Sequence, residues 1–437
     1  MIIPRQLRIL LLLQLAPAVT LAQATLTGNP IMQDISRPQL ESGLETTNVL
    51  WGDFAVSAIA DDNNNYSITN PIPGSQFYFA PAIALQHTQP HLSWNIGYAP
   101  GLRINLPSSL RPTQLTQSLG GTLHWDVSKR LAVGLRQDYL RTNDPFQKFG
   151  EAPFQPDIGL LNRPPDLAFS ALSYSELLLE GAADYKLDKH TLVGVNGSFM
   201  QLTGGQHPTQ KLEFINSRIS SGSAFLSHQF TARQTIGLQY QLLDMSFQGD
   251  SNTITQGLFL FDQAVLSPHT TFTIFAGPQY SRVHNQEAIT SQQIVVFMPG
   301  STTLWSPAAG GMLTWERKRT VLYADATRRV SAGLGLLSSA EMNTVSLNLQ
   351  RKVTSLWIAN VSGQVSDETL LTTPSSSRIL LWNIRAGISR EFSRDTHLRL
   401  AYQHIQQSGS YLYIYGPGNH NRFLLTFERS FAWPVGR

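Results

Sequence analysis

Residues 91–100, His-Leu-Ser-Trp-Asn-Ile-Gly-Tyr-Ala-Pro, alternate apolar side chains with small or polar ones. In an extended chain successive side chains point to opposite faces, so the apolar members share one face: Leu92, Trp94, Ile96 and Tyr98. This period-two pattern predicts a β-strand with one apolar and one polar face. The same alternation recurs at 236–242, 345–350, 380–389 and 422–431, whereas helical periodicity is nearly absent after residue 25.

A β-sandwich would also alternate, but the expected strands are too long for one. They run about 10–14 residues, against an average of about 5–6 in globular proteins. A strand that crosses a membrane at a tilt needs about 9–11 residues. The expected strands are 53–60, 75–86, 91–101, 113–126, 130–142, 172–185, 190–202, 218–230, 234–247, 253–265, 269–281, 304–316, 320–330, 341–351, 355–366, 378–393, 397–406 and 421–431.

The connections between these strands alternate between short polar turns and long segments. The long segments are 61–74, 102–112, 143–171, 203–217, 248–252, 282–303, 331–340, 367–377 and 407–420. An open sheet edge finds no hydrogen-bond partner in lipid, so long amphipathic strands are expected to close into a barrel. The sequence therefore predicts an all-β fold: a transmembrane antiparallel up-and-down β-barrel of about 18 strands (about 16–18), with short periplasmic turns and long extracellular loops.

Composition excludes several other classes of protein. Only 14% of residues are charged, against about 25% in an ordinary soluble domain, and aromatic residues reach 10%. Disorder is therefore not expected, and a net charge of +3 without a Lys/Arg cluster argues against a nucleic-acid partner. No stretch after residue 25 approaches the roughly 18–20 apolar residues of a spanning helix. Cysteine is absent, which removes disulfides and thiolate chemistry.

The N-terminus has the features of a secretory signal peptide. Arg5 and Arg8 precede an apolar stretch, and small residues allow cleavage after Ala22 or Ala24. A short N-terminal membrane anchor is the alternative. The expected organisation is a signal peptide at 1–24, a periplasmic N-terminal segment at 25–50, the barrel at 51–431 and a C-terminal tail at 432–437.

Aromatic residues cluster at the ends of the expected strands, as the interfacial girdles of a membrane barrel require. They are Trp51, Tyr78, Tyr98, Trp125, Tyr139, Tyr174, Tyr185, Tyr280, Trp305, Trp315, Tyr323, Trp357, Trp382 and Tyr402.

The last expected strand, Asn421-Arg-Phe-Leu-Leu-Thr-Phe-Glu-Arg-Ser-Phe431, carries a resemblance to a family. Over roughly residues 50–431 the chain resembles the porin-type β-barrels of the Gram-negative outer membrane, whose final strand typically ends in an aromatic residue. The resemblance implies an outer-membrane location, contact with outer-membrane lipid, and Phe431 as the signal read by the barrel-assembly machinery. The tail Ala432–Arg437 departs from that pattern. In general strand style the chain is also similar to porins associated with polysaccharide export.

Polar residues that alternate with the expected lipid-facing ones should line the lumen. They are Asn95, Arg136, Asp138, Gln239, Gln241, Asn348, Arg385, Arg399, Arg422 and Glu428. Each could be an ordinary solvated side chain or part of a substrate ladder. A three-residue turn at Arg394–Thr396 would pair Glu391 with Arg399 and weaken a basic patch there.

Two loops allow more than one interpretation. The loop 143–171, rich in Pro and Phe, is expected at the surface, with a constriction inside the lumen as the alternative. Asp61–Asn65 is expected to be a plain turn, and a calcium site is the alternative.

The leading functional hypothesis is a passive or weakly selective channel for small hydrophilic solutes. The alternatives are an accessory barrel for polysaccharide export and a structural or adhesive barrel that acts through its loops. The chain lacks the HExxH, GxSxG, P-loop and Rossmann motifs, so we expect no enzyme, no cofactor, no metal and no nucleic-acid partner. The solute and the oligomeric state stay open.

Overall fold

The computed structural model describes residues 47–63, 71–107, 113–142, 174–204, 216–247, 251–291, 294–333, 338–371, 378–393, 395–409 and 419–435. These residues form one antiparallel sheet of 18 strands, in which β1 pairs with both β2 and β18 and thereby closes the barrel. The predicted strand number and antiparallel up-and-down topology are confirmed. In this part of the chain there is no helix long and apolar enough to cross a membrane.

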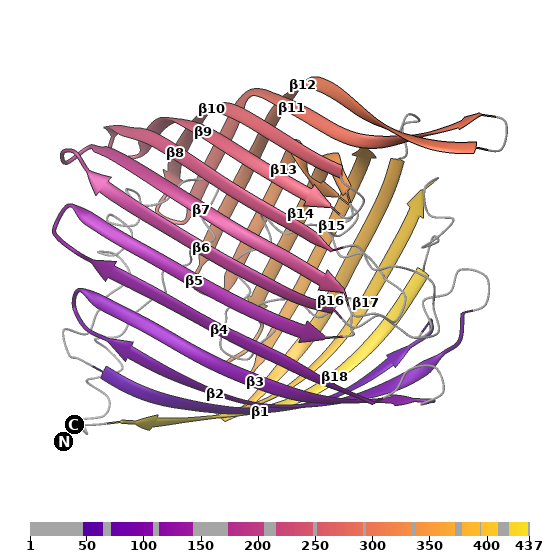
Figure 1. The fold of residues 1–437 in the computed structure, drawn as a ribbon. Helices are drawn as coiled ribbons and strands as arrows, with labels where there is room; N and C mark the ends of the chain where they lie inside the picture. Colours follow the sequence, from indigo (N-terminus) through magenta and orange to yellow (C-terminus); the bar gives the residue numbers. More distant parts are fainter. Residues whose placement is uncertain are drawn as a thin grey trace, which may run out of the picture.

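The strands follow one another around the barrel in chain order (Figure 1). Their bounds are β1 Thr47–Asp61, β2 Gly74–Thr88, β3 Leu92–Leu106, β4 Gln114–Asp126, β5 Leu131–Thr142, β6 Tyr174–Lys186, β7 Thr191–Gly204, β8 Ser217–Thr231, β9 Gln234–Phe247, β10 Ser251–Ser267, β11 Thr270–Ser291, β12 Ile294–Arg317, β13 Thr320–Gly333, β14 Ser338–Lys352, β15 Trp357–Leu370, β16 Arg378–Ser393, β17 Thr396–Gly409 and β18 Asn419–Pro434.

The alternation read from residues 91–100 is reproduced on β3. Ile96 is 50% exposed on the outer face, while Ser93 and Ala99 on the inner face are buried. Apolar side chains also point outward on other strands around the barrel. The exposed examples include Leu135, Val195, Leu226, Leu238, Leu260, Ile274, Val345, Ile384, Leu400 and Phe423. A continuous outward apolar band around a closed barrel is characteristic of a wall that faces lipid.

Strand β16 shows the height of this band. Its outer face carries Arg378, then five apolar side chains, then Arg390. At about 3.3 Å per residue and a tilt of about 40°, the two arginines are about 30 Å apart along the membrane normal, close to the ~25 Å expected of an apolar band. Arg378 forms an ion pair with Asp367 of β15 (2.6 Å), and Arg390 stacks on Trp357 (5.4 Å). Charged and aromatic groups thus mark the two interfaces.

Short turns join the strands at one end of the barrel, and β1 begins and β18 ends at that same end (Figure 1). Side-chain oxygens cap several of these turns. Asp188 Oδ1 accepts hydrogen bonds from the backbone N–H groups of His190 (2.7 Å) and Thr191 (2.8 Å). The bond from His190 is the main reason that the pKa of the Asp188 carboxyl lies below its usual value. Ser128 accepts an equivalent bond from Leu131 (3.0 Å).

Three features of the sequence prediction are wrong in their boundaries. The barrel begins at Thr47 rather than residue 51, and β18 continues past Phe431 to Pro434, with Trp433 opposite Leu50. The connection 248–252 is not long, because β10 already begins at Ser251. The segment 282–303 is not a loop but a continuation of β11 and β12, paired out to Ser291 and Ile294.

One physical reason explains all three differences between the expected and the observed strand boundaries. Backbone pairing remains favourable beyond the hydrocarbon layer, so strands continue after the apolar pattern has ended. The β11–β12 hairpin extends clear of the barrel at the end opposite the short turns (Figure 1). The expected loop 143–171 lies outside the described residues.

Candidate functional site

The inner wall of the barrel is the candidate site. All ten polar residues expected in the lumen lie on the inner face, opposite the exposed apolar side chains. Their exposure differs widely. Arg399 is exposed, Gln239 is fully buried at 0%, and Asp138 and Arg422 are each 2% exposed. The others are partly buried: Asn95, Arg136, Gln241, Asn348, Arg385 and Glu428.

Several of the buried polar residues are held by neighbours in the wall. Asn95 Oδ1 accepts a hydrogen bond from the Thr122 backbone N–H (3.2 Å), and Gln239 Nε2 donates to Ser223 Oγ (3.1 Å). Such bonds fix the side chains against the sheet, because a buried amide without a partner is costly. Both residues therefore shape the wall, and Gln239 has no contact with solvent.

Arg385, Arg399 and Arg422 do come from neighbouring strands, as the sequence predicts, but they do not share one environment. Gln403 lies between Arg385 and Arg422 in the register of β16, β17 and β18. Arg399 stands opposite Ser389 and Thr426, nearer the short-turn end. Of the three, Arg399 is the one whose side chain is open to solvent.

The predicted pairing of Glu391 with Arg399 is wrong. Glu391 stands opposite His397, and a bulge lies between Glu391 and Ser393. Ser393 pairs with Thr396, so the turn has two residues rather than three and the register shifts. Glu391 instead approaches Lys352 of β14 (3.8 Å).

Arg422 belongs to a buried charged cluster near the loop end of the wall, where β18 meets β1. The Arg422 Nε atom is 3.5 Å from Asp61 Oδ2, and His420 Nδ1 is 3.5 Å from Asp61 Oδ1. All three side chains are almost fully buried. Asp61 is therefore engaged with the Arg422 guanidinium and the His420 ring of the chain itself. Asp62 likewise accepts hydrogen bonds from Asn421 (2.8 Å and 2.5 Å).

A second charged cluster joins β5 and β6. Arg136 Nε donates to Asp138 Oδ2 (2.5 Å), and the Arg136 Nη1 atom is 3.7 Å from Glu180 Oε2. Two carboxylates around one guanidinium leave this part of the wall slightly acidic. Charges of both signs thus occur on the inner face.

Four residues of the expected aromatic girdle face inward instead of outward. Tyr78 donates or accepts a hydrogen bond with Thr116 (3.1 Å), Tyr323 donates to Glu316 (3.1 Å), and Trp51 donates to Gln86 (3.3 Å). Tyr174 packs against a buried apolar cluster. The girdle expectation rested on distance from the strand end, and only the parity of each position within its strand could have separated the two faces.

Inward phenylalanines form a feature that sequence reasoning missed. Phe225, Phe261 and Phe275 each stand opposite a glycine on the neighbouring strand: Gly194, Gly237 and Gly310. A Cβ atom built on any of these glycines would lie 2.2–2.4 Å from the ring. The rings therefore lie flat over the glycine backbone and do not project far into the lumen. The sequence signal is a Phe and a Gly at inward positions of adjacent strands.

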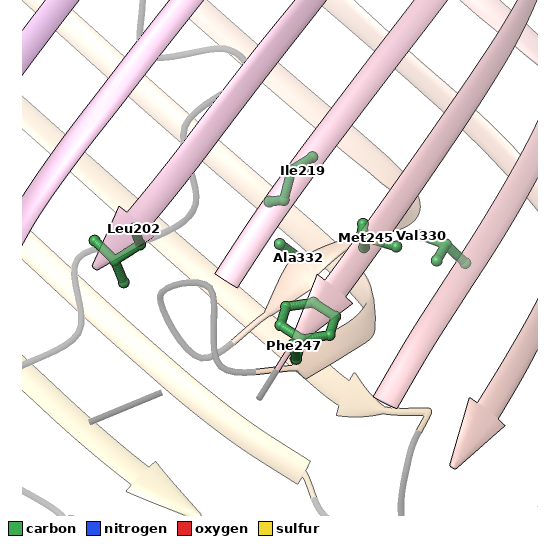
Figure 2. Close-up of a cluster of buried hydrophobic side chains, with 6 residues drawn as sticks. All are labelled: Leu202, Ile219, Met245, Phe247, Val330 and Ala332. Atoms are coloured by element: carbon green, nitrogen blue, oxygen red, sulfur yellow. The ribbon is translucent and has the colours of Figure 1, made fainter. Parts of the chain in front are cut away.

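The end of the β13–β14 hairpin, residues 329–333 with 338–341, bends into the barrel. Pairing of β13 with β12 stops at Arg328, although its pairing with β14 continues to Gly333. Val330 and Ala332 lie on the same side of β13 as the outward Arg328, yet they are 1% and 3% exposed. They pack against side chains of the inner face of β7, β8 and β9 (Figure 2): Leu202, Ile219, Met245 and Phe247.

Polar contacts hold this inward tip. Gln279 of β11 accepts a hydrogen bond from the Val330 N–H (2.8 Å) and donates a long one to the Val330 carbonyl (3.5 Å). Thr253 of β10 and Ser339 of β14 share a hydroxyl hydrogen bond (2.8 Å). The sequence prediction placed a loop at 331–340, so the tip was not foreseen. An outward face can contact the inner wall only if the hairpin folds inward, and the tip therefore occupies part of the lumen at the loop end.

Within the described ranges, no three His, Asp or Glu side chains are grouped so that they could hold a metal ion.

The chain matches no family model and no curated protein. Among solved structures it is similar to OccK1 (OpdK) of Pseudomonas aeruginosa, with 9% identity, a TM-score of 0.43, and coverage of 88% of this chain and 99% of that one. It is also similar to OpdQ of the same species, with 9% identity, a TM-score of 0.44, and coverage of 90% and 98%.

A third similar structure is a BenF-like porin of Pseudomonas fluorescens Pf-5, with 9% identity, a TM-score of 0.44, and coverage of 90% and 100%. At such identities no residue role passes from these proteins to this chain.

Proposed function

We propose that the protein is an outer-membrane channel that lets small hydrophilic solutes diffuse passively or with weak selectivity. The observation that carries the proposal is a closed 18-strand wall with apolar side chains outside and polar ones inside. A barrel of about 16–18 strands is wide enough to leave an aqueous passage unless something fills it. One of the similar solved structures is a BenF-like porin, and its name agrees with this proposal.

The wall suggests where the passage is wide and where it narrows. Near the short turns, inner-face side chains such as Arg399 and Gln350 are exposed. Toward the loop end, inner-face side chains such as Gln76 and Asn105 are fully buried. The inward β13–β14 tip lies at that same end. We therefore propose a vestibule open to the periplasm and a constriction on the cell exterior side.

The charges favour weak rather than strong selectivity. Arg422 is engaged with Asp61, and Arg136 with Asp138 and Glu180. Arg399 is left as an open cation, and at physiological salt its field extends only about 8 Å. The resulting preference for anions should be small and should decline as salt rises.

Planar-bilayer recording of the purified protein tests the proposal. We expect stepwise ion conductance, and liposomes containing the protein should admit small sugars faster than larger ones. A correctly folded barrel that gives no conductance and admits no sugar would contradict the channel and favour a structural barrel acting through its loops.

The outer-membrane location and the assembly route belong to the same proposal. Phe431 lies on the outer face of β18 beneath Arg429 and stacks on Trp433 (5.7 Å). Either aromatic ring could be read by the barrel-assembly machinery, because both sit at the end of the closing strand. Measuring how much of the Phe431→Ala and Trp433→Ala variants accumulates in isolated outer membranes shows which ring is read. The variant that lacks the recognised ring should accumulate less.

A further inference from the structure

Four arginines form a row on the outer face of the barrel at its short-turn end. They are Arg317 of β12, Arg351 of β14, Arg390 of β16 and Arg429 of β18. Each pairs with the first residue of a neighbouring strand: Arg317 and Arg351 with Thr320, Arg390 with Trp357, and Arg429 with Thr396. The four side chains therefore lie at one level of the barrel.

Alternation sends these cations outward and the adjacent acids inward. Glu316 precedes Arg317, Glu391 follows Arg390, and Glu428 precedes Arg429. Because adjacent residues of a strand point to opposite faces, each pair is split between lumen and membrane. Glu316 and Glu391 confirm this placement, since they contact the inward Tyr323 and Lys352.

The guanidinium groups are available at the surface. All four arginines are exposed, and none forms an ion pair within the described part of the chain. Arg390 lies over the rings of Trp357 (5.4 Å) and Phe392 (4.9 Å), and Arg429 over Phe431 (5.0 Å). An aromatic ring with a cation above it is the side-chain combination found at the boundary between hydrocarbon and headgroups.

The row is confined to one arc of the barrel. On β4, β6 and β8 the corresponding outward positions near the turns are Trp125, Tyr185 and Phe230. In that arc Lys129, Arg130, Lys189 and Arg233 lie in the turns instead. Neighbouring strands are about 4.8 Å apart, so arginines on alternate strands are about 10 Å apart, close enough for one patch to contact several headgroups.

We propose that this arginine row binds the phosphate groups of anionic phospholipids in the periplasmic leaflet of the membrane. Outward cations at headgroup depth, with no carboxylate beside them on the same face, attract phosphate diesters, and arginine can engage two phosphate oxygens at once. The proposal rests on the membrane placement proposed above, and not on transport. Lipid bound here would hold the β12–β18 arc at a fixed depth in the leaflet.

Native mass spectrometry of the full chain tests the proposal by measuring which lipids stay bound to it. The probes are phosphatidylglycerol and phosphatidylcholine with identical acyl chains. The wild type should retain phosphatidylglycerol preferentially. Each cation beside an anionic lipid surface contributes about a fivefold change in binding. The quadruple variant carries Arg317→Gln, Arg351→Gln, Arg390→Gln and Arg429→Gln. Its ratio of retained phosphatidylglycerol to retained phosphatidylcholine should therefore be at least about tenfold lower than that of the wild type.

The matched control removes the same charge from turns on the other arc: Lys129→Gln, Arg130→Gln, Lys189→Gln and Arg233→Gln. It should keep the wild-type preference. Equal loss in both variants would show that net charge and not the row is responsible, and absence of any preference in the wild type would overturn the proposal. If the quadruple variant does not assemble, the double variant Arg390→Gln/Arg429→Gln is tested in its place. A smaller decrease in the preference for phosphatidylglycerol is then expected.

This readout is independent of conductance. A barrel that prefers phosphatidylglycerol but carries no ion current would support lipid binding by the arginine row and refute the channel. A barrel that conducts ions without that preference would support the channel and refute lipid binding by the row.

Discussion

At the scale of single residues, the face on which a side chain lies decides its role more than its chemical type. Tyr78 and Tyr98 are both near strand ends, yet Tyr78 contacts Thr116 inside the barrel and Tyr98 is exposed outside. Arg399 and Arg422 are both inward, yet one is open to solvent and the other is fixed by Asp61. Substitutions should therefore have effects that depend on parity and depth.

Adjacent positions on β3 should tolerate charge very differently. Ile96 faces lipid, and an arginine at the middle of a lipid-facing wall costs about 2–4 kcal/mol. Ile96→Arg should reduce the amount of heat-modifiable barrel in outer membranes, whereas Asn95→Arg, whose side chain enters the lumen, should assemble. Equal tolerance of both variants would show that this strand is not embedded in the membrane.

The exposed Arg399 should control ion selectivity, and the buried Arg422 should not. Arg399→Gln removes an open cation from the wall and should shift the reversal potential toward cations at low salt. Arg422→Gln should instead lower the resistance of the barrel to thermal unfolding, because the buried Asp61 carboxylate loses the guanidinium beside it. A larger selectivity change in the Arg422 variant would place the conducting path along β18 and not β17.

At the scale of secondary-structure elements, the membrane sets where strands must pair but not where they end. β12 and β13 remain paired through their lipid-facing positions, and their pairing ends at the charged Arg328. Above that level the two hairpins diverge. β11–β12 extends beyond the barrel, and the β13–β14 tip turns into the lumen. An open edge costs little where water or other side chains can satisfy it.

The inward tip should limit conductance. Val330→Asp places a charge among Met245, Phe247 and Ile219, which should release the tip from the wall because an unpaired buried charge is strongly unfavourable. Single-channel conductance should rise, with the barrel still heat-modifiable. Ser331→Asp, on the opposite side of the same strand, is the control and should leave conductance near the wild-type value. Unchanged conductance in Val330→Asp would mean that the tip does not narrow the passage.

At the scale of the whole molecule, the closed sheet gives the protein two distinct ends. Capped short turns occupy one end, and the extended β11–β12 hairpin occupies the other (Figure 1). The outward arginine row lies at the first end, and the buried inner wall with its inward tip lies toward the second. Such polarity has a functional meaning only if the barrel inserts in one orientation.

Labelling of introduced cysteines on intact cells checks the orientation. The chain has no native cysteine, so each signal reports one position. Thr302→Cys, on the extended hairpin, should react with a membrane-impermeant maleimide from outside. Asp395→Cys, in a short turn, should react only after the outer membrane is permeabilised. The opposite pattern would invert the topology and assign the arginine row to the outer leaflet.

The sequence by itself determined the barrel, because lipid imposes a rule that each strand must obey separately. Period-two alternation and strand length follow from local residues such as Leu92–Tyr98, and lipid allows such strands no open edge, so the closed antiparallel 18-strand sheet could be predicted. Inward and outward faces could likewise be assigned wherever alternation was unbroken, as at Asn95 and Ile96.

Only the tertiary structure decided which inward residues meet. The Asp61–His420–Arg422 cluster forms because the first and last strands close the sheet, which no local pattern encodes. The bulge after Glu391 changed its partner from Arg399 to His397. Val330 could reach Met245 only by a bend of the β13–β14 hairpin across the lumen. Such contacts depend on register, closure and bending, which are properties of the assembled sheet and not of any one strand.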